Sequence, residues 1–431
     1  MNGCPLCDCG GAGHAGDRPV VGVLGASGVV GAAAVRALSA LGVETFRLGA
    51  RRPGAVAEVA HRLPHGAAET WAVDLDDPDR LAEFCAGCRV VLNCAGPSYQ
   101  VRGRVARAAL AVGADYVDVA GDEPAHAELS TIDVAVLGRS AVLSAGMLPG
   151  LSALLPRWLA ERGTGADRAT PPGTSHGEAA GGRLTAWTGG LERCSRTVAA
   201  DLLLSIGTGG PGRAAASAGP VPSYGESLAA WRDGRRVSRA LSAEDDAELP
   251  FFPGAVAVRP YLSGEAERLA RALDLDGLDW FNVFPGHRVR DALGALGGFL
   301  AERAGRAGRA EGESAGGPGR ALDAAAERLA RACELDLVGR RAYYRMVFAL
   351  ESASGATTTA VLGTGDSYRL TATVGALAVA SCLAGRVPPG LHYAAEVLDP
   401  AETVRLLGSI PGVTLDVSHA PIELGTAVGA L

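Results

Sequence analysis

The sequence predicts an α/β protein in which a doubly wound parallel sheet precedes an α+β domain with a mainly antiparallel sheet. Three observations support this prediction. From Pro19 to Ser144, short apolar runs alternate with helix-length segments, and the runs are continuously apolar, as in strands buried on both faces. The second half carries strand and helix patterns in a mixed order. The 431 residues are 48% hydrophobic and 20% charged, which is typical of a folded chain with two or three domains of roughly 150 residues.

The elements of the first 150 residues follow this apolar periodicity. Residues 20–24 are continuously apolar and predict a strand, and residues 28–41 carry apolar side chains at helical spacing until Gly42 ends the helix. The same unit then repeats, with right-handed crossovers between parallel strands. Further strands are expected at residues 44–48, 69–73, 89–93, 115–119 and 141–144. Further helices are expected at residues 53–63, 78–86, 101–112 and 123–137.

A glycine-rich turn, Gly22-x-x-Gly25-x-x-Gly28-x-x-Gly31, lies between the first strand and the first helix. Gly25 permits a tight turn, Gly28 lets backbone N–H groups approach a diphosphate at the positive helix end, and Gly31 allows close packing. The spacing departs from G-x-G-x-x-G, so a purely structural turn is the alternative. Its position between a strand and a helix predicts a Rossmann-type dinucleotide site. The expected cofactor contacts are Gly25, Ala26, Ser27, Gly28, Val29 and Val30.

The end of the second strand predicts the form of the cofactor. NAD-binding enzymes place an Asp or Glu there on the ribose 2′-hydroxyl, whereas this chain has Arg51 and Arg52. Two guanidinium groups suit a 2′-phosphate, so NADP(H) is the expected cofactor. The alternative is a solvated Arg pair at a helix start, where the helix dipole mildly disfavours cations. Asp74 and Leu75, after the third strand, are expected beside the adenine.

The basic residues exclude several classes of enzyme. All 40 residues of the Lys+Arg total are Arg, and the chain has no Lys. This excludes Schiff-base and pyridoxal-phosphate lysine chemistry, the Walker-A lysine and the Tyr-x-x-x-Lys pair of short-chain dehydrogenases. The net charge of -7 supplies no basic field for a phosphate backbone, so no nucleic acid partner is expected.

The cysteines and the N-terminus bear on compartment and metal binding. Nine Cys is an odd, scattered set, which favours reduced thiols in a cytoplasmic protein. Residues 1–17 lack the basic and apolar regions of a signal peptide and are interpreted as a flexible tail. Cys4, Cys7 and Cys9 with His14 could bind zinc, but a second ligand pair is missing and no metal is predicted. No apolar stretch reaches the roughly 20 uninterrupted residues that a bilayer needs, so no membrane association is expected.

Three segments resemble the saccharopine dehydrogenase-like reductases: VLNCAGPSY at residues 91–99, GADYVDVAGDE at 113–123 and SAGMLPGLS at 144–152. The resemblance implies that the loop after the fourth strand lies beside the nicotinamide ribose, through Cys94, Ala95, Gly96 and Pro97. It also implies a bilobal enzyme that uses a nicotinamide cofactor to reduce a C=N bond or oxidise the matching amine. Members commonly form homodimers, and some relatives are instead trans-acting enoyl reductases.

The change of pattern along the chain suggests the domain boundaries. Residues 1–17 form the tail, 18–150 the dinucleotide-binding domain, 151–385 the substrate and dimerisation domain, and 386–431 a segment expected to pack back on the first domain. Strands of the second domain are expected at residues 183–187, 255–259, 278–284, 342–350, 357–362 and 368–373. Helices are expected at residues 321–333 and 374–383.

Three residues are candidates for proton transfer or charge stabilisation. Tyr99 follows the fourth strand, whose loop borders the nicotinamide in open α/β sheets, or it packs as an ordinary aromatic. Asp122, like Asp118 and Glu123, ends the fifth strand and could orient an imine cation or cap the following helix. His287 comes from the second domain and could reach across the cleft, or it is an exposed loop residue.

The predicted reaction is NADPH-dependent reduction of an imine, or of a thiazoline- or pyrroline-like ring, in specialised metabolism or amino-acid modification. Saccharopine-forming members usually carry Asp before the Pro of the third segment, whereas this chain has Leu148 before Pro149, so saccharopine is not the expected substrate. The substrate is expected to be a small molecule or a carrier- or peptide-bound group. The alternatives are an enoyl reductase acting on a carrier-bound chain and a non-catalytic NADP-binding sensor or scaffold.

Overall fold

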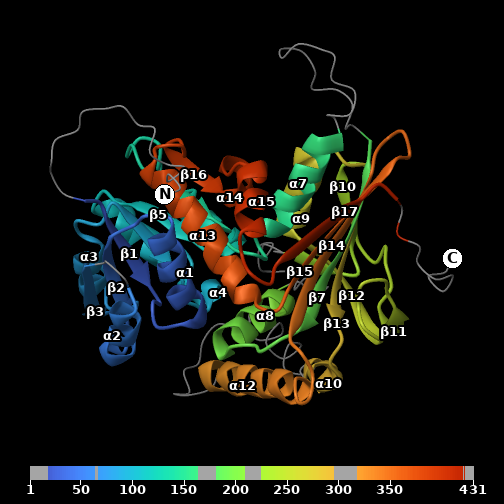
Figure 1. Ribbon diagram of the computed structural model, residues 1–431, viewed down its shortest axis with the longest axis horizontal. Helices are drawn as coiled ribbons and strands as arrows, with labels where there is room; N and C mark the ends of the chain where they lie inside the picture. The colour runs from blue at the N-terminus through green and yellow to red at the C-terminus, as the bar shows by residue number, and fades with distance from the viewer. Residues whose placement is uncertain are drawn as a thin grey trace, which may run out of the picture.

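The chain forms two sheets that lie side by side, with helices between and around them (Figure 1). The computed structural model describes residues 18–63, 67–163, 181–208, 225–295, 318–420 and 422. The predicted tail and its four candidate zinc ligands lie outside the described residues. Within the described part of the chain, no helix is both long and apolar enough to cross a bilayer.

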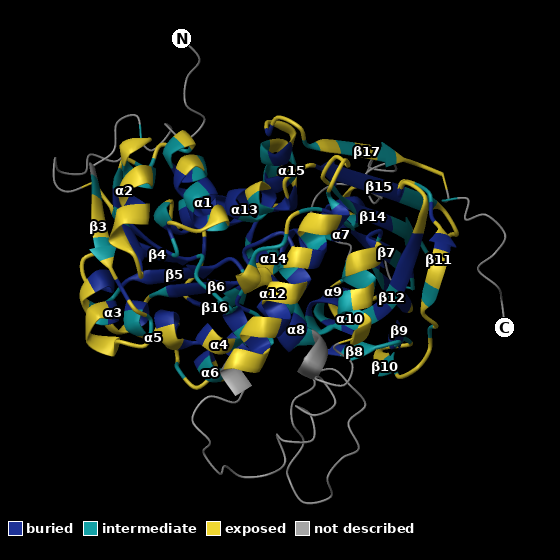
Figure 2. Ribbon diagram, turned by 90° about the horizontal axis from the view of Figure 1, so that it is seen from below, coloured by how far each residue is buried: buried dark blue, intermediate teal, exposed yellow. Residues whose placement is uncertain are grey.

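The first domain alternates strands and helices, as the apolar periodicity predicts. Its inner strands are buried, while α2 and α3 are exposed on their outer faces (Figure 2). The elements are β1 (Val20–Leu24), α1 (Val29–Ala40), β2 (Thr45–Ala50), α2 (Pro53–His61), β3 (Ala67–Ala72), α3 (Pro78–Cys85), β4 (Val90–Asn93), α4 (Ser98–Val101), α5 (Arg104–Ala111), β5 (Asp115–Asp118), α6 (Glu123–Leu129) and β6 (Ser140–Leu143).

The predicted helices at 101–112 and 123–137 are shorter than expected. The first begins at Arg104, after the separate short helix α4, and the second ends at Leu129. Beyond α6, the hydroxyls of Ser130 and Thr131 bond to backbone carbonyl oxygens, and Asp133 accepts a bond from the backbone N–H of Val136. These local bonds compete with the helical pattern, which explains why α6 ends early.

The strand order places the candidate site. It is β16-β6-β5-β4-β1-β2-β3, with β16 (Gly390–Tyr393) added from the C-terminal region, and the pairings within this sheet are parallel. From β1 the chain proceeds to β2 on one side and later to β4 on the other, so the order reverses between β1 and β4. In open α/β sheets, ligands bind outside the carboxyl ends of the strands at such a point.

The second domain is built on a mixed sheet, as predicted. Pairing of β7 with β13 is parallel, whereas β14 pairs with β7 and β15 in the antiparallel sense. Its elements are α7 (Leu151–Gly163), β7 (Arg183–Leu191), α8 (Arg196–Thr208), β8 (Gly225–Ser227), β9 (Ala230–Arg232), β10 (Arg235–Val237), β11 (Glu244–Glu248), β12 (Ala255–Ser263), α9 (Gly264–Ala272), β13 (Gly277–Phe284), α10 (His287–Ala295), α12 (Pro318–Asp336), β14 (Tyr343–Glu351) and β15 (Thr357–Thr364).

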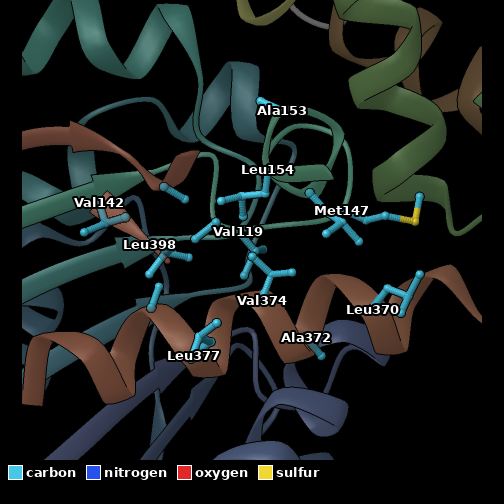
Figure 3. Close-up of a cluster of buried hydrophobic side chains, with 14 of the residues drawn as sticks. Val119, Val142, Met147, Ala153, Leu154, Leu370, Ala372, Val374, Leu377 and Leu398 are labelled. Atoms are coloured by element: carbon cyan, nitrogen blue, oxygen red, sulfur yellow. The ribbon is translucent and has the colours of Figure 1, made fainter. Parts of the chain in front are cut away.

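The strand predicted at residues 368–373 is wrong. These residues form the first turns of α13 (Ser367–Leu383), whose N-cap Asp366 accepts a bond from the backbone N–H of Arg369. The helix predicted at residues 374–383 is the rest of α13. Because most of α13 is buried, its first turns show no distinct apolar stripe in the sequence. Figure 3 shows the buried cluster in which Val374 and Leu377 of α13 lie with Val119 and Val142.

The C-terminal region contributes to both sheets. Helix α13 packs on α1, and β16 extends the first sheet beside β6. After α14 (Ala394–Val397) and α15 (Pro400–Gly408), β17 (Thr414–Ser418) pairs with β15 at the edge of the second sheet. The segment expected to return to the first domain is therefore divided between the two domains.

Candidate functional site

The glycine-rich turn is pressed between α1 and the loop after β4. Gly25 has a φ of +72°, and a Cβ there would lie 2.8 Å from the backbone of Cys94 and Ala95. A Cβ on Gly31 would lie 2.2 Å from the carbonyl oxygen of Gly25. That same oxygen accepts a bond of 2.9 Å from the N–H of Gly28. Glycine is therefore required at positions 25 and 31 for this turn to form.

The turn leaves the start of α1 open. Gly28 is the N-cap, with no side-chain cap, and Ser27, Gly28 and Val29 are exposed, Val29 at 58%. Ala26 is buried and its N–H donates to the carbonyl oxygen of Gly49, which ties the turn to β2. An uncapped helix N-terminus presents N–H groups and a partial positive charge, so this turn fits a diphosphate.

The residues predicted to recognise the adenosine end lie along the same edge. Arg51 and Arg52 follow β2 directly and are exposed. Asp74 and Leu75 follow β3, where Asp74 accepts a bond of 3.1 Å from the backbone N–H of Asp76 and thereby shapes the turn. Because β3, β2 and β1 are parallel neighbours, these three loops meet at one edge of the sheet.

A buried network fixes the loops after β4 and β5. The side-chain amide of Asn93 donates to Asp118 over 3.0 Å, and the Tyr116 hydroxyl donates to the same carboxylate. The other oxygen of Asp118 accepts bonds from the backbone N–H groups of Ala120 and Gly121. Since both oxygens of Asp118 are occupied, this carboxylate holds the loops in place. Burial raises the pKa of the Tyr116 phenol well above its ordinary value.

The predicted nicotinamide loop, Cys94 to Pro97, meets the second domain. The Gly96–Pro97 peptide bond is cis, and a Cβ on Gly96 would lie 2.8 Å from the methyl group of Thr197 on α8. Burial raises the pKa of the Cys94 thiol, so it remains uncharged. The loop is thus shaped by α8 on one side and by the glycine-rich turn on the other.

Asp201 links α8 to this loop. Its carboxylate accepts bonds from the Ser98 hydroxyl at 3.0 Å and from the Tyr99 backbone N–H at 3.3 Å. Burial is the main cause that raises the pKa of Asp201 to about 6, and the charge of Asp118 adds to it.

Asp122 and Glu123 take part in an ion-pair cluster between the domains. Asp122 accepts a bond of 2.8 Å from Arg268 on α9, and Arg268 also pairs with Glu123. The guanidinium of Arg268 lies 3.5 Å from the centre of the Tyr393 ring, and that ring stacks on His126. Asp122 is therefore already paired with a cation, which it shares with Glu123.

Two further carboxyl groups, buried Glu265 and half-buried Glu192, lie near the domain boundary. Glu265, 6% exposed, accepts bonds from the Gly150 N–H at 2.6 Å and from the Ser152 hydroxyl. Burial, assisted by the charge of Asp122, raises its pKa to about 8. Glu192, just after β7, accepts a bond of 2.6 Å from the Ser367 hydroxyl, and burial raises its pKa to about 7.

The three predicted catalytic residues lie in different settings. Tyr99 is half-buried and packs against the apolar cluster of α8 and α12. Asp122 is held by Arg268 between the domains. His287 is exposed at the start of α10, and its ring contacts Arg290. Their roles stay predictions.

Four second-domain residues form contacts with the first domain, or with helix α13 that covers it, and the sequence did not indicate them. They are Glu192, Asp201, Glu265 and Arg268. Each lies more than 100 positions from the partner it meets, and no motif surrounds them. Glu192 directly follows β7, but the strand predicted there ended at residue 187, so its position gave no signal in the sequence.

Known proteins resemble the chain in the first domain and in the overall fold. Residues 21–135 match the family described as the saccharopine dehydrogenase NADP binding domain. Among solved structures, apo histidine-tagged saccharopine dehydrogenase (L-Glu forming) from Saccharomyces cerevisiae is similar over 94% of this chain and 100% of that chain, with a TM-score of 0.58 and 16% identity. A short chain dehydrogenase from Burkholderia cenocepacia in complex with NADP covers 29% of this chain and 70% of its own, with a TM-score of 0.23 and 16% identity. No significant match was found among curated protein sequences.

These findings agree with the geometry of the glycine-rich turn. The family match includes that turn, the Arg pair after β2 and the loop after β4, and it implies an NAD(P) cofactor. The yeast structure is similar over 94% of this chain at low identity, so it shows the fold. Residues 21–135 of the first domain therefore match the saccharopine dehydrogenase NADP binding domain family, and the whole chain has a fold similar to that of the yeast saccharopine dehydrogenase.

Proposed function

We propose that this protein is an NADPH-dependent reductase that acts on a C=N bond and binds its substrate as a cation. The observation that supports this most is a set of three carboxyl groups at the boundary between the domains, of which Glu265 is buried and Glu192 and Asp201 are half-buried. Among the described residues, none of the three has an ion-pair partner. Burial opposes the ionisation of these carboxyl groups, and a cation bound beside them would favour their ionised form, so the three groups together favour a positively charged ligand.

The charge of the substrate distinguishes an imine reductase from an enoyl reductase. A protonated imine is a cation, and its charge disappears when hydride adds to the carbon. An enoyl thioester is neutral and becomes an enolate, which requires cations or hydrogen-bond donors for stabilisation. Carboxylates favour the protonated, reactive imine and disfavour an enolate, because opposite charges attract and like charges repel. The site therefore supports the imine.

The protein groups have separate roles in this proposal. When bound, the cofactor supplies the hydride. The turn at Gly25 and the start of α1 bind the diphosphate, and the loop from Cys94 to Pro97 borders the nicotinamide. A carboxyl group whose pKa lies near neutrality, such as Glu192 at about 7, can give a proton to an imine nitrogen.

The phosphate form of the cofactor is tested at Arg51 and Arg52. Replacing both, Arg51→Asp with Arg52→Ala, removes two charge-assisted bonds to the 2′-phosphate, each worth about 1.5–3 kcal/mol. We expect NADPH affinity to fall by at least about tenfold while NADH affinity stays unchanged. Arg235→Ala, on an exposed strand of the second sheet, is the control. Equal loss for both cofactors contradicts the assignment.

The reaction is tested with a substrate panel. Cyclic imines, thiazolines and pyrrolines are compared with enoyl thioesters, each free and carrier-bound, and NADPH consumption is followed by absorbance. We expect turnover of at least one C=N substrate and none of the enoyl thioesters. Turnover of an enoyl thioester instead supports the enoyl reductase. NADPH binding without oxidation by any member of the panel supports a sensor or scaffold.

A further inference from the structure

We propose that Asp201, on α8 of the second domain, is a positioning residue that holds the loop after β4 in the shape that receives the nicotinamide end of the cofactor. This inference rests on the proposed function, since it concerns the same cofactor site. It assigns a role in the first domain's site to a residue of the second domain.

The contacts of Asp201 converge on one short stretch of the loop. Its Oδ1 accepts bonds from the Ser98 hydroxyl and the Tyr99 backbone N–H, at 3.0 Å and 3.3 Å. Its Oδ2 lies 3.4 Å from the position that a Cβ on Gly96 would take. One carboxylate thus contacts the loop immediately before α4 and the first two residues of α4.

The start of α8, the helix that carries Asp201, is held in place by hydrogen bonds of Ser195. The Ser195 hydroxyl accepts a bond of 3.2 Å from the Val198 N–H at the start of α8. The Ser195 N–H donates to the Tyr368 hydroxyl on α13 over 2.8 Å. Because α13 packs on α1, the helix that carries Asp201 is tied to the first domain a second time. A residue on a helix held in this way can fix a loop precisely.

The charge of Asp201 is part of this role. A carboxylate accepts bonds roughly twice as strong as a neutral acceptor does, so it holds Ser98 and Tyr99 more firmly than an amide. Asp118, at the end of β5, is the charged neighbour that opposes this ionisation. Among the described residues, Asp201 has no ion-pair partner. The loop is therefore held most firmly when Asp201 is ionised.

A conservative substitution tests the proposal. Asp201→Asn keeps the shape of the side chain and removes its charge, and Ser98→Ala removes one donor from the loop. Asp336→Asn is the matched control, because Asp336 is a buried carboxylate that accepts two backbone N–H bonds, from Arg288 and Val289, within the second domain. All three proteins are compared with wild type in thermal stability, NADPH affinity and amide hydrogen exchange of residues 94–103.

We expect Asp201→Asn and Ser98→Ala to weaken NADPH binding by about tenfold, the loss of one charge-assisted bond. Exchange in residues 94–103 should rise in both variants without cofactor, and Asp336→Asn should change neither quantity. In wild type, NADPH affinity should fall as the pH drops through about 6, in part because Asp201 is protonated. The 2′-phosphate of the cofactor also titrates in this range, and it does so with every variant. The difference in pH dependence between wild type and Asp201→Asn therefore reports the titration of Asp201.

Other outcomes overturn the inference in distinguishable ways. If exchange and NADPH affinity in Asp201→Asn equal those of wild type, Asp201 does not position the loop. If Asp336→Asn produces the same losses, the effect is general destabilisation. If wild type does not bind NADPH at all, the proposed function fails and the positioning role fails with it, whatever the exchange of the loop shows.

Discussion

The substitution Gly31→Ala tests whether the glycine-rich turn binds the nucleotide. Helix propensity alone predicts a gain of about 1 kcal/mol, because Gly31 lies within α1. The structure predicts the opposite. A Cβ there would lie 2.2 Å from the Gly25 carbonyl oxygen, whereas ordinary contact begins at 3.4 Å, so the turn must move by roughly 1 Å. Overpacking of this kind costs about 1–3 kcal/mol and outweighs the propensity.

This displacement should affect cofactor binding more than it affects the stability of the protein. The Gly25 oxygen also accepts the Gly28 N–H bond, so its movement changes the N–H groups that face the diphosphate. Misplacement by about 1 Å can cost up to a hundredfold in a positioned interaction. We expect NADPH affinity, measured by fluorescence titration, to fall by at least about tenfold.

Gly408→Ala provides the control for the same chemical change. Gly408 ends α15, and a Cβ there would meet nothing within 4 Å. We expect this variant to bind NADPH like wild type and to be equally or more stable. If Gly31→Ala remains folded and binds NADPH with wild-type affinity, the turn is not the diphosphate site and the reasoning is refuted.

Two further predictions follow from the titration of buried groups. Glu265 has a pKa raised from 4.5 to about 8, so the folded state binds more protons than the unfolded state between these values, and stability should decrease as the pH rises through this window. Thermal unfolding across this range should show that slope, and Glu265→Gln should reduce it; an unchanged slope contradicts the assignment. The Cys333 thiol has a lowered pKa because Cys194 hydrogen-bonds to it, whereas burial raises the pKa of Cys85 and Cys382 to about 12. Iodoacetamide followed by peptide mapping should therefore modify Cys333 before Cys85 and Cys382, and equal rates contradict this.

Much of the first domain could be predicted from the sequence because its structure is local. Each buried parallel strand is a short apolar run, and each crossover helix shows its own period, so the order of elements follows the chain. The glycine-rich turn was recognisable for the same reason, since Gly25 and Gly31 are required by contacts within one strand–turn–helix unit and the adjoining loop.

The rest depends on contacts between distant parts of the chain. Helix α13 is apolar on all sides because it is buried between α1 and the strands, so its first turns resembled a strand. Asp201 and Ser98 meet across 103 positions, and Arg268 and Asp122 across 146. Such pairs follow from how the domains pack, which no single-segment pattern contains.

The route of the C-terminal region has a consequence for synthesis on the ribosome. The first domain emerges early, yet its last strand, β16, and the covering helix α13 are made only after most of the second domain. Until residues 390–393 appear, β6 has an unpaired edge, and such edges promote aggregation. The β6 edge is therefore an aggregation hazard during synthesis until residues 390–393 pair with it.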